Sequence, residues 1–201
     1  MGQRMSRRGV LRAAALALAL RPATSSAAES ALERLLGSRR MVRRFKPHPV
    51  STATVRRLLA AAVRAPSAGH TQPWSFVVVR DRERRVELGR AAHRQMFVAE
   101  APVVIVACVD ESCPKARYGE RGERYGVIDT AFASMCLLLA VVEAGLGACF
   151  VGAFEDADVA RLLRLPEHVR PLAVIPIGYP AESPSRMRLR PLRDVVHRER
   201  W

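Results

Sequence analysis

The sequence predicts a single domain in which helices and β-strands share one hydrophobic core. In some segments apolar residues recur at helical spacing, whereas short runs rich in β-branched residues are typical of buried strands. The chain has 201 residues, of which 49% are hydrophobic, and its mean hydropathy is close to zero. A chain of this length and composition can bury a core of its own.

The pattern predicts the following elements. The helices are expected at residues 30–36, 52–64, 83–97, 127–146 and 156–163, and the strands at residues 75–79, 103–109, 148–151 and 172–178. Ser51 and Thr52 are the candidate N-caps of the second helix. Residues 112–124 are rich in glycine and charge, and we expect them to form either a mobile loop over a functional site or an ordinary solvated connection.

The helix at residues 127–146 is the longest apolar element. Asp129, Ser134 and Glu143 interrupt it, which leaves an uncharged run of about thirteen residues, shorter than the roughly 20 residues that a membrane span needs. We therefore expect a helix at the centre of a soluble protein. Because this helix is apolar nearly all round, it needs cover on every side, and a chain of this size covers it most readily by forming a homodimer.

The first 28 residues resemble a twin-arginine signal peptide. They contain no acidic residue, and the sequence SRRGVL at residues 6–11 precedes an apolar run at residues 13–20 and small residues at 25–28. This pattern predicts export of the protein to the periplasm through the twin-arginine machinery. Residues 29–201 would then form the mature domain. The alternative is a cytoplasmic protein with a basic N-terminal arm or a misassigned start.

The charge and the cysteines exclude some functions. The net charge is +14, but only Lys46 and Lys115 are lysines, and no basic block is interleaved with aromatic residues. Nucleic acid is therefore not the expected partner, whereas anionic ligands such as phosphate are favoured. The four cysteines lack metal-site spacing, so no metal is expected; a Cys108–Cys113 disulfide and free thiols both remain open.

Two segments carry candidate ligand chemistry. Residues 38–45, SRRMVRRF, bring four arginines together, and planar guanidinium groups suit phosphate oxygens. A solvated basic turn is the alternative. Residues 65–74, APSAGHTQPW, form a loop of small residues and turn formers between a helix and a strand. Its backbone can approach a flat ligand at Gly69, and its polar groups suit the edge of a heterocycle.

These two motifs, in this order, resemble the opening of the nitroreductase family of FMN flavoproteins. Residues 125–154, with the long helix and the sequence GLG at 145–147, are similar to the family's central helix and following strand, as are PIGYP at 176–180 and RPL at 190–192. The resemblance covers nearly the whole chain after residue 28. It implies an α+β fold with a mostly antiparallel sheet, FMN as cofactor, and a homodimer with the long helix at its interface.

The resemblance also implies a set of site residues. Three groups of positions match the family's cofactor-binding segments. Arg39, Arg40, Arg43, Arg188 and Arg190 would bind the phosphate and ribityl chain of FMN; Pro66, Ser67, Ala68, His70 and Gln72 would border the isoalloxazine, often that of the other subunit; and Val151, Gly152 and Ala153 would meet its reactive edge. No catalytic side chain is expected, because FMN performs the hydride and electron chemistry.

The sequence departs from the family at two of these segments. Met41 stands where many members carry serine, and His70 stands where asparagine is common. The first change removes a hydroxyl from the phosphate site. The second introduces an imidazole that either couples the flavin potential to pH or serves as a plain hydrogen-bond donor.

The implied activity is a two-step reduction of nitroaromatic, quinone or similar acceptors, with NADPH or NADH as donor. Two alternatives remain, a dimethylbenzimidazole synthase that fragments reduced FMN and a flavin-binding redox module without turnover. Export would complicate the donor, because NAD(P)H is a cytosolic metabolite. An exported protein would need a membrane or redox-protein donor.

Overall fold

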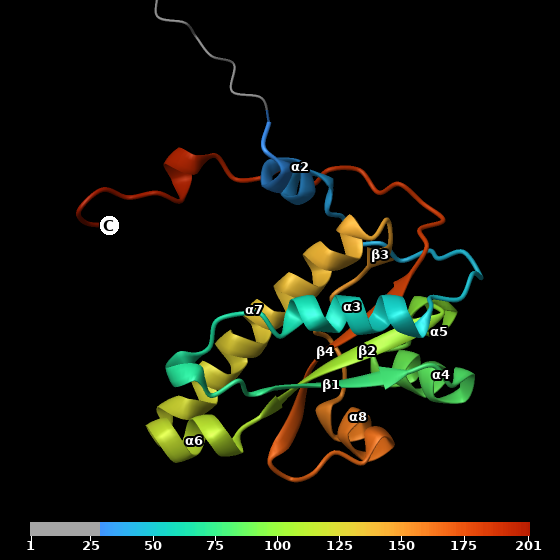
Figure 1. Ribbon diagram of the computed structural model, residues 1–201, viewed down its shortest axis with the longest axis horizontal. Coiled ribbons are helices and arrows are strands. Elements are labelled where there is room, and N and C mark those ends of the chain that lie inside the picture. The colour runs from blue at the N-terminus through green and yellow to red at the C-terminus, as the bar shows by residue number, and fades with distance from the viewer. Residues whose placement is uncertain (1–28) are drawn as a thin grey trace, which may run out of the picture. The chain divides into compact units, whose positions relative to one another are not determined.

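A four-stranded antiparallel sheet lies at the centre of residues 32–201, which form one unit in the computed structural model (Figure 1). The structure describes residues 29–201; the predicted signal peptide and its cleavage region lie outside the described residues. The order of the strands is β1-β2-β4-β3. Their bounds are β1 Trp74–Val79, β2 Val103–Asp110, β3 Gly147–Ala148 and β4 Val169–Gly178. The predicted mostly antiparallel sheet is confirmed.

Helices cover both faces of this sheet, because β2 alternates its side chains between two hydrophobic clusters. Val103, Ile105 and Ala107 pack toward α3 (Thr52–Ala62) and α7 (Arg121–Glu143). The intervening Val104, Val106 and Cys108 belong to the cluster on the other face. That cluster is formed with α4 (Arg82–Ala91), α5 (Phe97–Glu100) and α8 (Asp156–Leu163). The result is a three-layer α+β arrangement.

Side-chain caps mark the first residues of α3 and α4. Ser51 is the N-cap of α3, where its Oγ accepts a hydrogen bond from Thr54 N at 3.0 Å. Asp81 caps α4 in the same way through Arg84 N at 3.0 Å. The remaining helical elements are α2 Ala31–Ser38, α6 Ser112–Tyr118 and the 3-10 turns η1 Ala68–His70 and η2 Leu192–Asp194.

The long helix α7 is the predicted core helix, and within one chain it is covered on one side only. By length and composition it could cross a membrane, yet 44% of its most apolar window is buried against the protein. Ile128, Phe132 and Met135, spaced by four and three residues along one face, remain exposed, with Phe132 48% exposed. The uncovered side of α7 is therefore an apolar stripe.

Three predicted segments differ from the structure, one of them the strand expected at residues 148–151, which is reduced to the two-residue β3 and an isolated bridge at Val151. The helix expected at residues 83–97 is broken into α4 and α5, because His93 (φ 51°) and Arg94 (φ 61°) adopt left-handed conformations that end α4. The turn lets Leu88 and Val98 both reach the core. Residues 112–124 are not a loop: they form α6 and the first turn of α7.

The close packing of α6 against α7 explains why residues 112–124 are helical and not a loop. Gly122 and Gly126 lie four residues apart on one face of α7, where a side chain on Gly122 would collide with the Pro114 backbone. A Cβ on Gly126 would lie 2.8 Å from Val109 Cγ1. Gly122, one of the glycines of the expected loop, instead permits a close contact between α6 and α7, and Gly126 permits a close contact between α7 and β2.

Candidate functional site

The arginine-rich segment at residues 39–45 is fixed beside the sheet by its backbone. Met41 forms a parallel bridge with Ala148, and Val42 N donates to Ala148 O at 2.8 Å. Val42 is buried, whereas Arg43 on the neighbouring position is exposed. The backbone pairing therefore holds the segment in place while the guanidinium groups stay available to a ligand.

A cavity of about 480 Å³ opens between this segment and the C-terminal segment that follows β4. Four arginines and no acidic side chain are among the residues that line it. The lining residues are Leu36, Gly37, Arg39, Arg40, Met41, Arg43, Pro184, Ser185, Arg186, Met187 and Leu189. This combination of cations and apolar groups suits an anionic ligand with an uncharged body.

The structure separates the five predicted phosphate-binding arginines. Arg39, Arg40 and Arg43 line the cavity, but Arg188 and Arg190 lie outside its lining, on the same C-terminal segment. The guanidinium group of Arg190 donates to Asp194 O at 2.6 Å. Arg186 lines the cavity instead, and the sequence reading missed it because the exposed tail carries several arginines with no local pattern that distinguishes one from another.

A second missed residue, Glu182, fixes the C-terminal segment. Its Oε1 accepts hydrogen bonds from Arg43 N at 2.6 Å and Arg44 N at 3.0 Å. Ala181 N also donates to Arg44 O at 2.9 Å. Glu182 is thus the group that holds one wall of the cavity against the other, and a separation of 139 residues leaves no local sequence signal for it.

The predicted flavin-edge residues Val151, Gly152 and Ala153 are not among the residues that line this cavity, but they follow a residue that contacts its wall. Val151 pairs with Val174 through hydrogen bonds of 3.0 and 2.9 Å, while Gly152 and Ala153 are exposed. Immediately before them, Phe150 N lies 3.5 Å from Met41 Sδ. The methionine that replaces the usual serine therefore packs between the arginine segment and this strand end.

The buried thiol of Cys149 lies in the same neighbourhood. Burial raises its pKa, an effect that the positive charge of Arg43 opposes and the charge of Glu182 supports. Cys108 is buried in the sheet, and burial raises its pKa to about 12. All four cysteines are free thiols in the structure, so no Cys108–Cys113 disulfide is formed there.

The remaining predicted residues form a separate loop between α3 and β1. Gly69 (φ 54°), His70 (φ 60°) and Gln72 (φ 48°) all adopt left-handed conformations. The loop closes on itself through His70 N to Ser67 O at 3.0 Å and Gln72 N to Ser67 Oγ at 3.1 Å. The His70 and Gln72 side chains also approach each other, with their Nε2 atoms 3.1 Å apart.

Asp129 of α7 fixes this loop by a hydrogen bond from its buried side. It is 3% exposed, and its Oδ2 accepts a hydrogen bond from Ala68 N at 2.9 Å. Burial raises the pKa of Asp129, which the hydrogen bond from Ala68 partly offsets. On the other side of the loop, a Cβ on Gly69 would collide with the Arg117 and Tyr118 side chains of α6.

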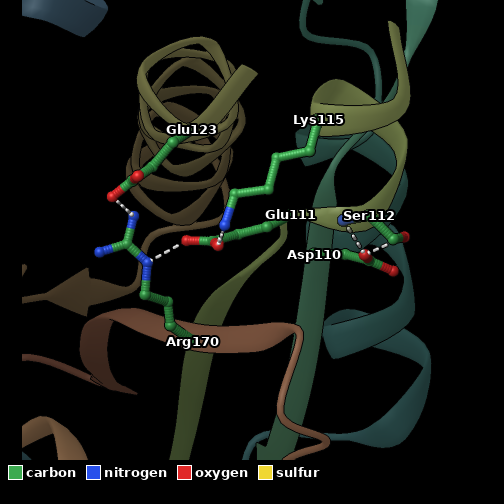
Figure 2. Close-up of polar contacts among 6 residues, drawn as sticks. All are labelled: Asp110, Glu111, Ser112, Lys115, Glu123 and Arg170. Carbon is green, nitrogen blue, oxygen red and sulfur yellow. Dashed lines mark hydrogen bonds and ion pairs between the residues drawn. The ribbon is translucent and has the colours of Figure 1, made fainter. Parts of the chain in front are cut away.

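An ion-pair network anchors α6 in that position. The Glu111 carboxylate binds both Lys115 and Arg170, and Arg170 Nη2 reaches Glu123 Oε1 of α7 at 3.1 Å (Figure 2). Burial by itself would raise the pKa of Glu111, but the hydrogen bonds and charges of Lys115 and Arg170 outweigh it and lower the pKa. At the start of α6, Asp110 Oδ1 accepts from Ser112 N at 3.0 Å.

One chain therefore brings the predicted site residues together in two places. The arginine segment and residues 151–153 meet at β3, near the C-terminal end of α7. The 66–72 loop lies near α6 at the other end of α7 (Figure 1).

The sequence matches the Nitroreductase family over residues 36–99 and 91–179. The chain belongs to this family. It is similar to an NADH dehydrogenase of Thermus thermophilus, with 37% identity over 79% of this chain and 91% of the relative. It is 33% identical to the oxygen-insensitive NADPH nitroreductase of Salmonella typhimurium, over 83% of this chain and 73% of that protein.

Solved structures of flavin reductases and nitroreductases have a similar fold. The NADPH:FMN oxidoreductase of Vibrio harveyi, solved in complex with NAD+, superimposes on 84% of this chain and 76% of its own with a TM-score of 0.78 and 27% identity. A nitroreductase A of Vibrio parahaemolyticus gives a TM-score of 0.78 at 26% identity. The sequence resemblance to nitroreductases is thus confirmed, together with the α+β fold.

Proposed function

We propose that this nitroreductase-family protein carries out a two-step reduction, in which a nicotinamide donor is oxidised first and a nitroaromatic, quinone or similar acceptor is reduced afterwards. The protein is an FMN-dependent oxidoreductase, in keeping with relatives named NADPH nitroreductase, FMN reductase and NADPH-flavin oxidoreductase. The observation that carries the assignment is the cavity in which four arginines converge.

The residues of the cavity fit FMN. Arg39, Arg40, Arg43 and Arg186 would hold its phosphate, because several guanidinium groups together offset a double negative charge. Arg40 also donates to Gly37 O at 2.8 Å and Arg39 O at 2.7 Å, which orients its guanidinium at the cavity wall. The apolar lining would receive the uncharged part of the cofactor.

Other residues would meet the flavin ring. The exposed backbone of Gly152 and Ala153 offers hydrogen-bond groups next to the cavity, and Gln95 Nε2 fixes Ala153 O at 3.2 Å. When bound, FMN supplies the hydride and electron transfer, so the protein's part is to bind, orient and exclude water.

The complete site would be formed by a homodimer. In one chain the 66–72 loop is bonded to the N-terminal half of α7, whereas the arginine segment pairs with β3 beyond the C-terminal end of α7. The stripe of Ile128, Phe132 and Met135 is uncovered. Packing two copies along this stripe would bury it and bring the loop of one subunit toward the cavity of the other. A monomeric mass in solution, measured by light scattering, would contradict this arrangement.

The donor and the location are linked proposals. Relatives named as NADPH or NAD(P)H enzymes support a nicotinamide donor. Export through the twin-arginine pathway to the periplasm rests on residues 6–28, which lie outside the described residues. An exported protein would need another donor, such as a membrane quinol or redox protein. Cell fractionation and the rate of flavin reduction by NAD(P)H test the two proposals together.

The decisive experiment is an absorption spectrum of the purified protein, followed by anaerobic titration with NADPH, NADH and a quinol. Bound flavin that is reduced by a donor and reoxidised by a nitroaromatic or quinone acceptor is the expected result. Loss of the flavin on aerobic reduction would instead identify a flavin-fragmenting enzyme. Stoichiometric FMN without acceptor reduction above the rate of free FMN would identify a redox module, and a protein that stays colourless with FMN would overturn the assignment.

A further inference from the structure

Asp129 is a carboxylate buried in the middle of the most apolar helix of the protein. It is 3% exposed, and moving a carboxylate out of water into such a place is costly unless it is hydrogen-bonded. Its neighbours Thr130 and Ser134 are also buried, and Ser134 Oγ donates within the helix to Thr130 O at 2.8 Å. Asp129 instead reaches out of the helix, to Ala68 N at 2.9 Å.

The loop that donates this hydrogen bond contains two residues in a strained backbone conformation. His70 and Gln72 are non-glycine residues with φ of 60° and 48°, and each left-handed residue of this kind costs about 1–2 kcal/mol. The other hydrogen bonds of residues 67–72 in the described part of the chain stay within the loop. The bond from Ala68 N to Asp129 is the one that ties the loop to α7.

The opposite side of the loop is closed by α6. Arg117 and Tyr118 lie against Gly69 so closely that a Cβ there would collide with both side chains. The Glu111 network fixes α6 to β4 and α7 (Figure 2). The loop thus lies between a hydrogen-bond acceptor on α7 and two large side chains on α6. Asp129 is the group that fixes its position relative to α7 through a hydrogen bond.

We propose that Asp129 is a positioning residue that fixes the 66–72 loop for contact with the flavin by accepting the hydrogen bond of the Ala68 N–H. The role rests on the proposed function, because it assumes that this loop borders the isoalloxazine. Asp129 does not touch the cofactor. It acts through the loop backbone, and its effect on FMN binding follows from the conformation of Ser67, Ala68 and His70.

The test compares three variants of the full chain. D129A removes the acceptor, D129N keeps a neutral acceptor, and S134A removes a different buried polar group of α7 whose bond stays within the helix. Amide hydrogen exchange of Ala68, followed by NMR in the flavin-free protein, reports the loop directly. Titration of FMN by fluorescence quenching reports its consequence.

We expect D129A to speed exchange of the Ala68 amide and to raise the Kd for FMN by about tenfold or more, as loss of a hydrogen bond to a charged group predicts. D129N should change both quantities by less than about threefold, and S134A should leave both unchanged. Unaltered exchange and affinity in D129A would overturn the role. So would an equal effect of S134A.

A second variant keeps the test decisive if D129A fails to fold. A68P deletes the donor and leaves Asp129 in place, and the extended conformation of Ser67 (φ −140°, ψ 148°) accepts a following proline. We expect A68P to weaken FMN binding as much as D129A, and unchanged affinity would overturn the role. If the wild-type protein binds no FMN, the proposed function fails, while the exchange comparison of D129A, S134A and the wild type still tests the loop.

Discussion

The two parts of the site differ in how the protein holds them. The arginine cavity lies between the end of α2, the segment that follows it and the C-terminal segment, and its binding groups are the ends of long side chains that are half-buried at Arg39 and Arg40 and exposed at Arg43 and Arg186. The 66–72 loop is compact and strained, and a buried carboxylate holds it from within the core. Because of this difference, we expect substitutions in the cavity to change the affinity for FMN alone. Substitutions that disturb the support of the loop should change both the affinity for FMN and the stability of the fold.

The largest effect is expected at the contact between α7 and α6, the helix that lies against the 66–72 loop. G122A places a Cβ against the Pro114 backbone, which neither helix can relieve without separating α6 from α7. We expect a loss of about 3 kcal/mol in the free energy of unfolding, together with weaker FMN binding, measured by denaturant titration and fluorescence. The control is G152A, whose nearest contact is Phe150 Cε1 at 3.6 Å; equal stability of the two variants would contradict the role of the α6–α7 contact.

The next largest effect tests the cavity. The double variant R39Q/R43Q removes two of the guanidinium groups that line it, and we expect the Kd for FMN to rise by about 100-fold, because each charge-assisted bond contributes about 1.5 kcal/mol or more. The thermal midpoint of the flavin-free protein should not change. R56Q, an exposed position on α3, is the matched control, and a similar loss of affinity there would show that the effect is one of net charge.

A smaller effect is expected for the ion-pair network. Because the pKa of Glu111 is lowered in the folded protein, its contribution to stability is present above the unfolded value of about 4.3 and is lost as the pH falls through the lower folded value. E111Q should therefore lose about 1–2 kcal/mol at pH 7 and show a weaker loss on acidification than the wild type. Denaturant titrations between neutral and acidic pH measure this, with exposed Glu167 as the E167Q control.

The smallest effect is expected at His70. H70N introduces the residue common in the family at a position with φ of 60°, and asparagine adopts this conformation more readily than other non-glycine residues. We expect a gain of about 0.5 kcal/mol or less and a change of less than about twofold in the Kd for FMN. Denaturant titration and fluorescence titration of FMN measure the two quantities, and a larger rise in the Kd would contradict this expectation.

Sequence patterns predicted the strands and most helices because their signals are local. The β-branched run of β2 and the N-cap Ser51 place their elements within a residue or two. The pattern failed where contacts distant in sequence decide the structure. Gly122 contributed to the expectation of a loop, yet it permits the close approach of α6. The continuous helical spacing of residues 83–97 did not reveal the left-handed turn at His93 and Arg94.

The order of the two motifs in the sequence was sufficient to determine the family, the cofactor class and the arginine segment. Tertiary structure alone decided which arginine of the tail lines the cavity, that Glu182 closes it, and that Asp129 supports the loop. The physical reason is that a ligand-binding motif is a run of neighbouring residues, whereas the groups that hold it in place are 61 to 139 residues away and meet it only when the chain has folded.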